Sequence, residues 1–574
     1  MKYLIVIFLF VSINLKATNY YVSNSGNDSN SGITTILPWK TLNNVNTNTF
    51  LQGDSILLKR GDVWIEALTQ GNYILSGYGT GSKPEIRGYD EITGWTTLGN
   101  WSEYSTGVWR WATTESNRLW VNGRERKESA SLTLTDEYFW IWTGGYLYIK
   151  APSNPATYFH SIMNGLKLNA DCIYMLGATN AKIINVKISG SVGIVRSSNV
   201  EIYNCEIGYR TDFYGLTLMG SANIGCTNIL IHGNVVDTGD SLKYNYYRGA
   251  NGSTNNGIWL NRGSSNCKVY NNYIRNWSHS GIAMFNDDNV SYTMHDNEIY
   301  NNFITAPLID YGRGFGADYQ EANGYNNSFH DNTIVNTSVQ NQISANGLKF
   351  YNNIIDNVVG CTYPDKANVG VGISISSYNP NSPPVNMEIY NNLIRNCADP
   401  AIWVWNFDAA TQVSHINIHD NNFVNCNQAF GQYSLFVRYN QPIINHNSYS
   451  NNHIYNSFNT NTVKYNNVQM NVSAFNGISP NYNDVISGND AILKFGGYPT
   501  TVDDLQIIYN ETNTSKTFSL SQPMINTAGD KYTSSVTLQP YTSMVLMKDK
   551  NILIKYLTGE DGKSLFIGNK LMMR

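Results

Sequence analysis

One short phrase of alternating apolar and polar positions recurs through the middle of the chain. In Glu388-Ile-Tyr-Asn-Asn-Leu-Ile-Arg-Asn396, apolar residues flank a polar turn centred on Asn392. The apolar positions predict inward-facing β-strands, and the Tyr or His before the turn is expected on the outside. Asparagine tolerates the left-handed conformation of a turn and can hydrogen-bond along a stack of identical turns. The phrase recurs with central asparagines at positions 234, 272, 297, 332, 353, 392 and 421.

The spacing of these asparagines predicts a solenoid. The steps are 38, 25, 35, 21, 39 and 29 residues, so the smallest step is one bare coil and the larger steps carry loop insertions. Successive coils are expected about 4.8 Å apart, the spacing of parallel strands. Four histidines are predicted to share one column of the repeat and to stack there as structural residues. They are His232, His295, His330 and His419.

A second recurring strand, often opened by Gly-Ile, lies between the asparagine turns. Alternation predicts that it buries one row of side chains and turns another row outward. The outward row is rich in aromatic residues, which are costly to leave bare and suit the apolar face of a sugar ring; a loop folded over them is the alternative. The predicted inward residues are Ile258, Leu260, Ile282, Met284, Phe315, Ala317, Ile402 and Val404, and the outward ones are Trp259, Asn261, Ala283, Phe285, Gly316, Asp318, Ser374, Ser376, Trp403 and Trp405.

These phrases resemble the right-handed parallel β-helix of the pectin-lyase-like superfamily. The N-terminal Tyr20-Tyr-Val-Ser-Asn-Ser-Gly-Asn-Asp-Ser-Asn-Ser-Gly32, followed by Pro38-Trp-Lys-Thr-Leu42, resembles the entry to secreted bacterial members. The resemblance covers the chain from about Tyr20 to Val468 and implies that residues 38–46 form a short capping helix. It implies the fold and leaves the reaction open, because this fold hosts lyases, hydrolases, epimerases and adhesins.

Breaks in the repeat divide the rest of the chain. Residues 1–17 are predicted to be a signal peptide, because the apolar run from Tyr3 to Leu15 is too short to span a bilayer. Residues 18–89 form an N-terminal cap and the first coils, and residues 161–475 form the β-helix. Residues 90–160 are an inserted, aromatic-rich β subdomain with an Asn-Gly hairpin, whose aromatic residues are expected to pack its own core; a similar insertion occurs in β-helix glycoside hydrolases. Residues 476–548 form a C-terminal β domain, and residues 549–574 are a tail.

Charge and cysteine content narrow the class. Only 14% of residues are charged and the net charge is −4, so the basic footprint of a nucleic-acid-binding protein is absent. We expect a secreted monomer with no membrane span in the mature chain. The seven cysteines form neither a disulfide framework nor a CxxC zinc pattern, and we expect small interior residues, with a disulfide as the less favoured alternative. Cys397 and Cys426 each follow an Asn that closes a repeat and are expected to stack on neighbouring coils.

The densest cluster of candidate chemistry is Asp310-Tyr-Gly-Arg-Gly-Phe-Gly-Ala-Asp318. Glycosidic hydrolysis needs one carboxylic acid and a second carboxylate as base or nucleophile, and Asp310 and Asp318 are the predicted pair. Arg313 would bind a uronate or keep one Asp ionised, and His279, about one coil away, is a candidate proton donor or ligand. The alternative is a tight turn in which Arg313 pairs with an Asp for structural reasons.

The substrate is predicted to be a polysaccharide, and the leading reaction is hydrolysis. A polysaccharide lyase is the second reading, with Lys243, Arg248, Lys366, Arg313 and Asp287 as candidate parts. A non-catalytic glycan-binding or adhesive protein is the third. Asp287 and Asp288 resemble the paired Asp of pectin-hydrolysing relatives, but the Gly-His-Gly and Arg-Ile-Lys phrases found there are lacking, so a solvated turn or a Ca²⁺ site is the alternative. The predicted sugar-binding residues are Trp259, Phe285, Tyr311, Trp403, Trp405, Lys243 and Arg248.

Overall fold

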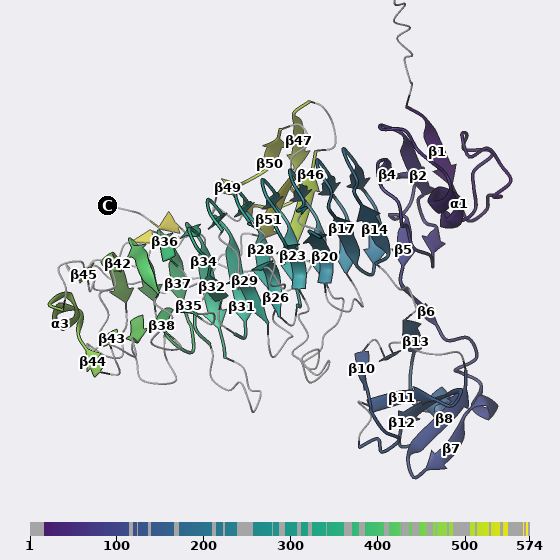
Figure 1. Cartoon of the computed structure of the whole chain (residues 1–574), viewed down its shortest axis with the longest axis horizontal. Helices are drawn as coiled ribbons and strands as arrows, with labels where there is room; N and C mark the ends of the chain where they lie inside the picture. Colours follow the sequence, from purple (N-terminus) through teal and green to yellow (C-terminus); the bar gives the residue numbers. More distant parts are fainter. Residues whose placement is uncertain are drawn as a thin grey trace, which may run out of the picture.

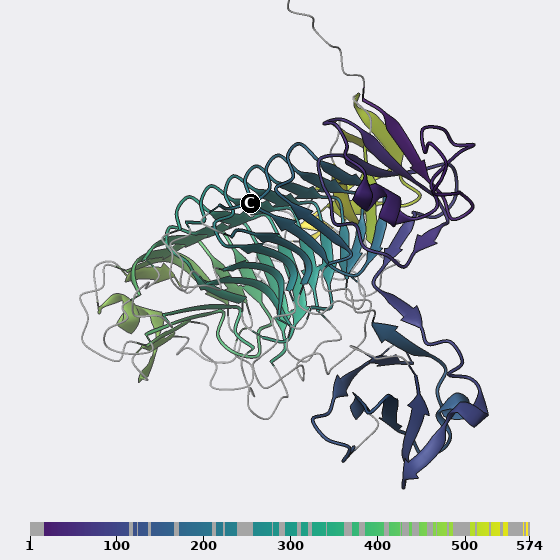
Figure 2. The ribbon, with the colours of Figure 1, turned by 45° about the vertical axis from the view of Figure 1, so that its right-hand side comes forward.

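A computed structural model shows a long β-helix with two smaller β units attached to it (Figure 1). Figure 2 shows the strands stacked along the long axis, with the inserted subdomain projecting away from the N-terminal end. The structure describes residues 17–571 except for 114–118, 123, 136–138, 166–170, 209–213, 222–223, 238–255, 278, 286–292, 307–311, 319–323, 340, 361–369, 378–384, 407–412, 425, 427–434, 439–446, 456–462, 466–467, 479–481, 486–504, 511–513, 527–529, 540–542, 549–565 and 568–569.

Each full coil contributes three strands, which stack on the equivalent strands of the next coil in parallel register. The fold is therefore the predicted right-handed parallel β-helix. The first stack contains β15 (Lys182–Ile184), β18 (Glu201–Tyr203), β21 (Leu230–His232), β24 (Lys268–Tyr270), β27 (Glu298–Tyr300), β30 (Ser328–His330), β33 (Lys349–Tyr351), β36 (Val385–Tyr390), β39 (Ser414–His419) and β42 (Ser448–Tyr455). The second contains β16 (Lys187–Ser189), β19 (Glu206–Gly208), β22 (Val235–Asp237), β25 (Tyr273–Arg275), β28 (Phe303–Thr305), β31 (Thr333–Thr337), β34 (Ile354–Val358), β37 (Leu393–Arg395) and β40 (Asn422–Val424), and β45 (Tyr482–Val485) pairs with β42.

The third stack is a separate 12-stranded sheet that carries the candidate site, and we call it the site sheet. Its predicted inward residues are all fully buried in the main core, which confirms the predicted alternation. Its strands are β14 (Ile173–Leu176), β17 (Val192–Val195), β20 (Tyr214–Met219), β23 (Asn256–Asn261), β26 (Ser280–Phe285), β29 (Arg313–Asp318), β32 (Asn341–Ser344), β35 (Ile373–Ser377), β38 (Ile402–Asn406), β41 (Leu435–Arg438), β43 (Val463–Tyr465) and the antiparallel β44 (Val468–Met470), which leads into α3 (Val472–Asn476).

A ladder of buried asparagines closes the turn between the first two stacks. Asn332, for example, donates Nδ2 to the Ile299 carbonyl (3.0 Å) and accepts at Oδ1 from Nδ2 of Asn302 (2.9 Å). The residue before each ladder asparagine has positive φ, which is the left-handed conformation that asparagine and aspartate tolerate. The ladder consists of Asn234, Asn272, Asn302, Asn332, Asn353, Asn392, Asn421 and Asn452.

One predicted member of this ladder is wrong. Asn297 belongs to a second, shorter ladder with Asn327 (Nδ2 to Oδ1, 2.9 Å), and Asn302 takes its place in the main one. The same His-Asp-Asn sequence occurs at two different corners of the coil. His295-Asp-Asn297 lies before strand β27, whereas His330 is the last residue of strand β30 and Asp331 and Asn332 form the turn after it. With this correction the unequal steps of 25 and 35 residues become two steps of 30 residues.

Aromatic rings stack along the edge of the first stack. Their centroids lie 4.6–5.3 Å apart, so each ring packs on the ring of the next coil. The predicted column is confirmed for three histidines, whereas His295 stacks on Tyr325 (4.8 Å) in a different column. The column consists of Tyr203, His232, Tyr270, Tyr300, His330, Tyr351, Tyr390 and His419.

The N-terminal coils are capped by α1 (Leu42–Thr47), which buries Leu42 and Val45 over the open end. The helix begins four residues later than the predicted span of 38–46. The strands of this part are β1 (Asn19–Val22), β2 (Ser55–Lys59), β3 (Val63–Trp64), β4 (Ile74–Tyr78) and β5 (Glu85–Arg87). Strands β4 and β5 pair directly with β15 and β16, so the insertion between them leaves the stacks unbroken.

The inserted subdomain is an eight-stranded sheet with its own core, which includes Trp95, Trp101, Trp111 and Trp140. Val121 pairs with Arg124, so the predicted two-residue Asn-Gly hairpin is confirmed. The elements are β6 (Tyr89–Glu91), a 3₁₀ turn (Leu98–Asn100), β7 (Ser102–Ser105), β8 (Val108–Ala112), β9 (Leu119–Val121), β10 (Arg124–Glu128), β11 (Phe139–Thr143), β12 (Tyr146–Lys150), α2 (Pro155–Tyr158) and β13 (Ile162–Gly165).

The C-terminal β unit packs a separate small core around Ile508, Met524 and Leu546. It consists of β46 (Leu505–Tyr509), β47 (Lys516–Ser519), β48 (Met524–Asn526), β49 (Lys531–Tyr532), β50 (Ser535–Leu538) and β51 (Ser543–Lys548), and the hairpin β52 (Phe566–Ile567) and β53 (Lys570–Leu571) follows.

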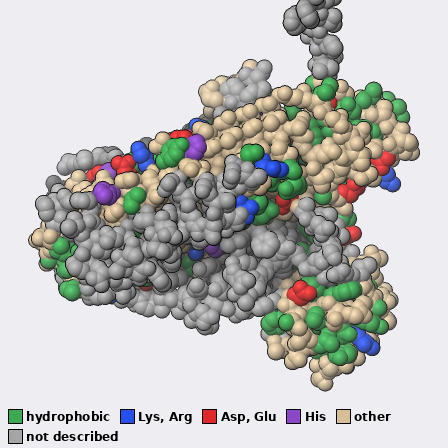
Figure 3. All heavy atoms as spheres, viewed as in Figure 1, with side chains coloured by type: hydrophobic (Ala, Val, Ile, Leu, Met, Phe, Trp, Pro, Cys, Tyr) green, Lys and Arg blue, Asp and Glu red, His purple; other side chains and the backbone are tan. Residues whose placement is uncertain are grey.

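The described cysteines are all buried thiols without a disulfide, and Cys361 lies outside the described residues. Cys397 and Cys426 are neighbours in adjacent coils, as expected. In the described part of the chain no helix is long and apolar enough to cross a membrane. Charged side chains of both signs are intermingled on the described surface in Figure 3.

Candidate functional site

The outer face of the site sheet holds two rows of side chains in register. The predicted outward residues fall into these rows as the alternation requires. The first row contains Thr217, Trp259, Ala283, Gly316, Gln342, Ser374 and Trp403. The second contains Met219, Asn261, Phe285, Asp318, Ser344, Ser376 and Trp405; the side chains of Asp318 and Trp405 lie outside the described residues.

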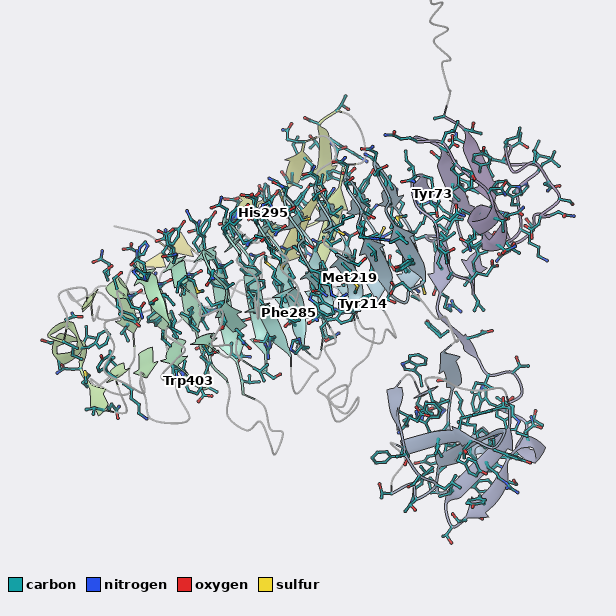
Figure 4. All side chains as sticks on the ribbon, in the orientation of Figure 1. Tyr73, Tyr214, Met219, Phe285, His295 and Trp403 are labelled. Atoms are coloured by element: carbon teal, nitrogen blue, oxygen red, sulfur yellow. The ribbon has the colours of Figure 1, made fainter. Side chains whose placement is uncertain are left out.

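Only some of the predicted aromatic residues come together. Trp259 lies 5.3 Å from Phe285 and 6.3 Å from Tyr214 between ring centroids, and its Nε1 donates to the Phe285 carbonyl (3.3 Å). Trp403 lies five strand positions further along the same row, which is about 24 Å at the usual strand spacing. Figure 4 shows Tyr214, Phe285 and Trp403 in this order along the helix, with Trp403 towards the α3 end.

Arg313 opens strand β29 and lies flat against the outer face. Its side chain crosses Gly316, where an added Cβ would stand 3.4 Å from the arginine Cδ. Glycine at this position therefore leaves room for the arginine side chain to lie against the sheet. Nη1 donates to Oε1 of Gln342 (3.0 Å), the residue is 8% exposed, and Nε is buried without a partner. Among the described residues no carboxylate pairs with this guanidinium. A buried cation without a counter-ion is costly, which marks a place for an anionic ligand.

His279 lies beside Arg313 at the same edge of the sheet. Its backbone carbonyl accepts from the Arg313 amide (3.1 Å), and its ring meets Phe285 edge-on at 5.7 Å. Burial, and then the positive charge of Arg313, lower the pKa of His279 well below its usual range, so the ring is neutral at pH 7. Nδ1 lies 2.9 Å from Oδ1 of Asn256. With Nδ1–H donating there, Nε2 keeps its lone pair and can accept a proton.

Several buried polar atoms on this face have no hydrogen-bond partner within the described part of the chain. They are Nδ2 of Asn256, both amide atoms of Asn261, Nε of Arg313 and Oγ of Ser376. Each such atom costs about 1–3 kcal/mol when left unpaired, and native structures hold only a few of them. Their concentration on one face, beside an indole ring, is typical of a surface prepared for a polar ligand.

A carboxylate that the sequence reasoning missed lies at the start of the same face. Asp171 accepts from the Tyr214 hydroxyl (3.3 Å) and overhangs Gly193, where an added Cβ would stand 2.0 Å from Oδ2. Burial raises the pKa of Asp171. Its sequence signal is slight, because it stands before a strand whose coil lacks the repeated phrase.

Asp399 is a second such carboxylate, before β38. It accepts from the Gly370 amide (2.7 Å), and burial raises its pKa to about 6.

The remaining predicted site residues lie outside the described residues and stay predictions. All of them lie in segments that precede or follow strands of the site sheet. Because Asp310 and the side chain of Asp318 are not described, the distance between the two predicted catalytic carboxylates is not defined. Among the described residues no group of three His, Cys, Asp or Glu is arranged to hold a metal ion, and the Ca²⁺ site likewise stays a prediction. The residues concerned are Lys243, Arg248, Asp287, Asp288, Asp310, Tyr311 and Lys366.

No family model matches the chain, and no curated protein matches it. Solved structures do: XylC in complex with xylose is 12% identical with a TM-score of 0.41, covering 76% of this chain and 75% of that one. The GH136 lacto-N-biosidase from Eubacterium ramulus is 14% identical with a TM-score of 0.37, covering 76% and 68%. PfbA, a surface adhesin of Streptococcus pneumoniae, is 13% identical with a TM-score of 0.36, covering 69% and 88%. At this distance the likeness carries no argument about activity.

Proposed function

We propose that the protein is a secreted enzyme that cleaves a uronate-containing polysaccharide by β-elimination on the outer face of the site sheet. One observation carries this choice: the buried guanidinium of Arg313 has no described counter-ion and adjoins the neutral imidazole of His279. A uronate carboxylate would supply the missing counter-charge, and a neutral imidazole is the form that accepts a proton.

The proposed step uses these two groups together. His279 Nε2 takes the proton from C5 of the uronate, the electron pair of that C–H bond forms the C4=C5 double bond, and the C4–O4 bond breaks. The released O4 takes up a proton from water. Arg313 neutralises the sugar carboxylate, on which negative charge builds as the C5 proton leaves. A carboxylate at Arg313 also offsets the positive charge that lowers the pKa of His279, so substrate binding makes the ring a stronger base.

Hydrolysis by Asp310 and Asp318 is the second candidate. The register supports it, because Asp318 pairs with Phe285 and Ser344 in the second outward row and ends the strand that Arg313 opens. Glycosidic cleavage by a carboxylate pair then follows, with Arg313 orienting the sugar rather than activating it. A glycan-binding protein without catalysis is the remaining reading.

A product assay separates these readings. Purified protein is incubated with a panel of plant, algal and animal polysaccharides, with and without chelator, while reducing ends and the ultraviolet absorbance of unsaturated uronates are followed. Absorbance that disappears in His279→Gln and Arg313→Met is the expected result. Reducing ends without absorbance, abolished by Asp318→Asn, overturn elimination in favour of hydrolysis. Bound polysaccharide with no product overturns catalysis altogether.

A further inference from the structure

Strand β23 presents one indole ring between two buried amides. Trp259 and Asn261 lie in the two outward rows of the site sheet, and Asn256 opens the strand in register with Ser280 and Arg313; Asn256, Trp259 and Asn261 are 0%, 5% and 0% exposed. Nδ2 of Asn256 and both Nδ2 and Oδ1 of Asn261 have no hydrogen-bond partner among the residues that the structure describes, although all three atoms are closed to solvent. The proposed elimination does not use Asn261 or Trp259, so these groups need another explanation.

The unpaired atoms specify the chemistry of a partner. Nδ2 of Asn261 needs an acceptor and Oδ1 needs a donor, and neighbouring sugar hydroxyls supply both at once. A carboxylate at neutral pH supplies only acceptors and would leave Oδ1 unpaired. The indole face of Trp259 adds the apolar surface on which the C–H face of a sugar packs.

The charges on this stretch point the same way. Strands β20, β23 and β26 carry no Lys or Arg along their described residues, so an acidic group bound at β23 would be buried there without a cation from these strands. Arg313 stands two strand positions away on β29, about 10 Å at the usual spacing, which is more than one sugar ring.

We infer that β23 forms a subsite for an uncharged, hydroxyl-rich sugar, and that the substrate is a heteropolysaccharide in which such a sugar accompanies the uronate bound at Arg313. The uronate half of this statement rests on the proposed function, whereas the β23 subsite stands on its own contacts.

Calorimetry tests the subsite with acidic probes of two kinds. Polygalacturonate and alginate consist of acidic units alone, whereas rhamnogalacturonan backbone, gellan and hyaluronan combine acidic and neutral sugars. All proteins carry His279→Gln to suppress elimination, and chromatography confirms that no product forms during titration. We expect at least one mixed polymer to bind more tightly than both acidic ones. Equal or tighter binding of the acidic polymers, or no binding to any probe, overturns the inference.

Variants locate the effect. Asn261→Leu keeps a similar volume and is expected to weaken binding of the mixed polymer about tenfold through lost hydrogen bonds, while binding of the acidic polymers is unchanged. Thr337→Val is the matched control, because its Oγ1 is also buried without a hydrogen-bond partner among the described residues but lies on β31 of the second stack, away from the site sheet, and we expect no change. Unchanged affinity of Asn261→Leu for the mixed polymer overturns the subsite, because the Asn261 amide would then not contact the sugar.

Two further results keep the outcomes separate. If Asn261→Leu fails to fold, Asn261→Asp, which keeps the shape and adds a negative charge, is expected to weaken binding of the mixed polymer at least as much. If wild-type protein never forms product but Asn261→Leu still loses mixed-polymer affinity, the proposed elimination fails and the β23 subsite remains. If product forms and the Asn261 variants bind normally, the reverse holds.

Discussion

Replacing Arg313 by Met should separate function from stability. The substitution removes a guanidinium that is 8% exposed and has no described counter-ion, so it relieves a desolvation cost of several kcal/mol. It also loses the hydrogen bond to Gln342, worth about 1.5–3 kcal/mol for a charged donor. We therefore expect a variant about 1–2 kcal/mol more stable than wild type, with cleavage reduced at least about 100-fold, or ~2.7 kcal/mol in the barrier.

Arg395 provides the matched control. It is also a poorly exposed arginine, but its Nη2 lies 2.7 Å from Oδ2 of Asp356, a buried carboxylate in the second stack. Arg395→Met removes the cation from that carboxylate, which keeps its hydrogen bond from Nδ2 of Asn396 (2.8 Å), and should cost about 3 kcal/mol, the opposite sign to Arg313→Met. Chemical denaturation followed by tryptophan fluorescence measures the stabilities, and the unsaturated-uronate absorbance measures cleavage. A destabilised Arg313→Met with unchanged cleavage would refute the reasoning, because Arg313 would then be a structural residue.

The other predictions use the same assays. Because the pKa of His279 is lowered, the deprotonated base persists below pH 6.5; cleavage should stay level above that pH and fall only in more acid solution, and Arg313→Met should move the residual inflection upward. Asp399, whose folded pKa is raised from 3.8 to about 6, loses folded-state stability as pH rises through that window, so Asp399→Asn should gain on the order of 2–3 kcal/mol at pH 8 and little at pH 4; an equal gain at both would contradict the assignment. Asn332→Ala breaks the ladder on both sides and should cost about 3 kcal/mol in denaturation, whereas an unchanged midpoint would mean that the ladder adds nothing. Trp403→Ala should raise KM for long oligosaccharides only, since it lies about 24 Å from Trp259; equal effects on short ones would place it elsewhere in binding.

The coil architecture was predictable because it repeats. Each inward Ile or Val is supported by an equivalent residue one coil away, so the period of two and the asparagine phrase together fix strands, core and register. The misassigned Asn297 shows where this fails: a phrase can recur at the wrong corner of the coil, and only the hydrogen bond to Asn327 reveals it.

The site was predictable only in part. Alternation identified Trp259 and Phe285 as outward, because that property is local to a strand. It could not reveal that Arg313 reaches Gln342 on the next strand, or that Asp171 reaches Tyr214 across Gly193, because these contacts join residues of different coils. The neutral state of His279 likewise depends on a charge brought next to it by the stacking.

The inserted subdomain leaves and rejoins the helix through a two-strand stalk. Tyr89 in β6 pairs with Gly165 in β13, so the two ends of the insertion are held side by side, while β4 and β5 pair with β15 and β16 as if nothing lay between them. The β-helix therefore requires of the inserted segment only that its two chain ends lie next to each other. The subdomain could therefore be exchanged for another one without changing the coils of the β-helix.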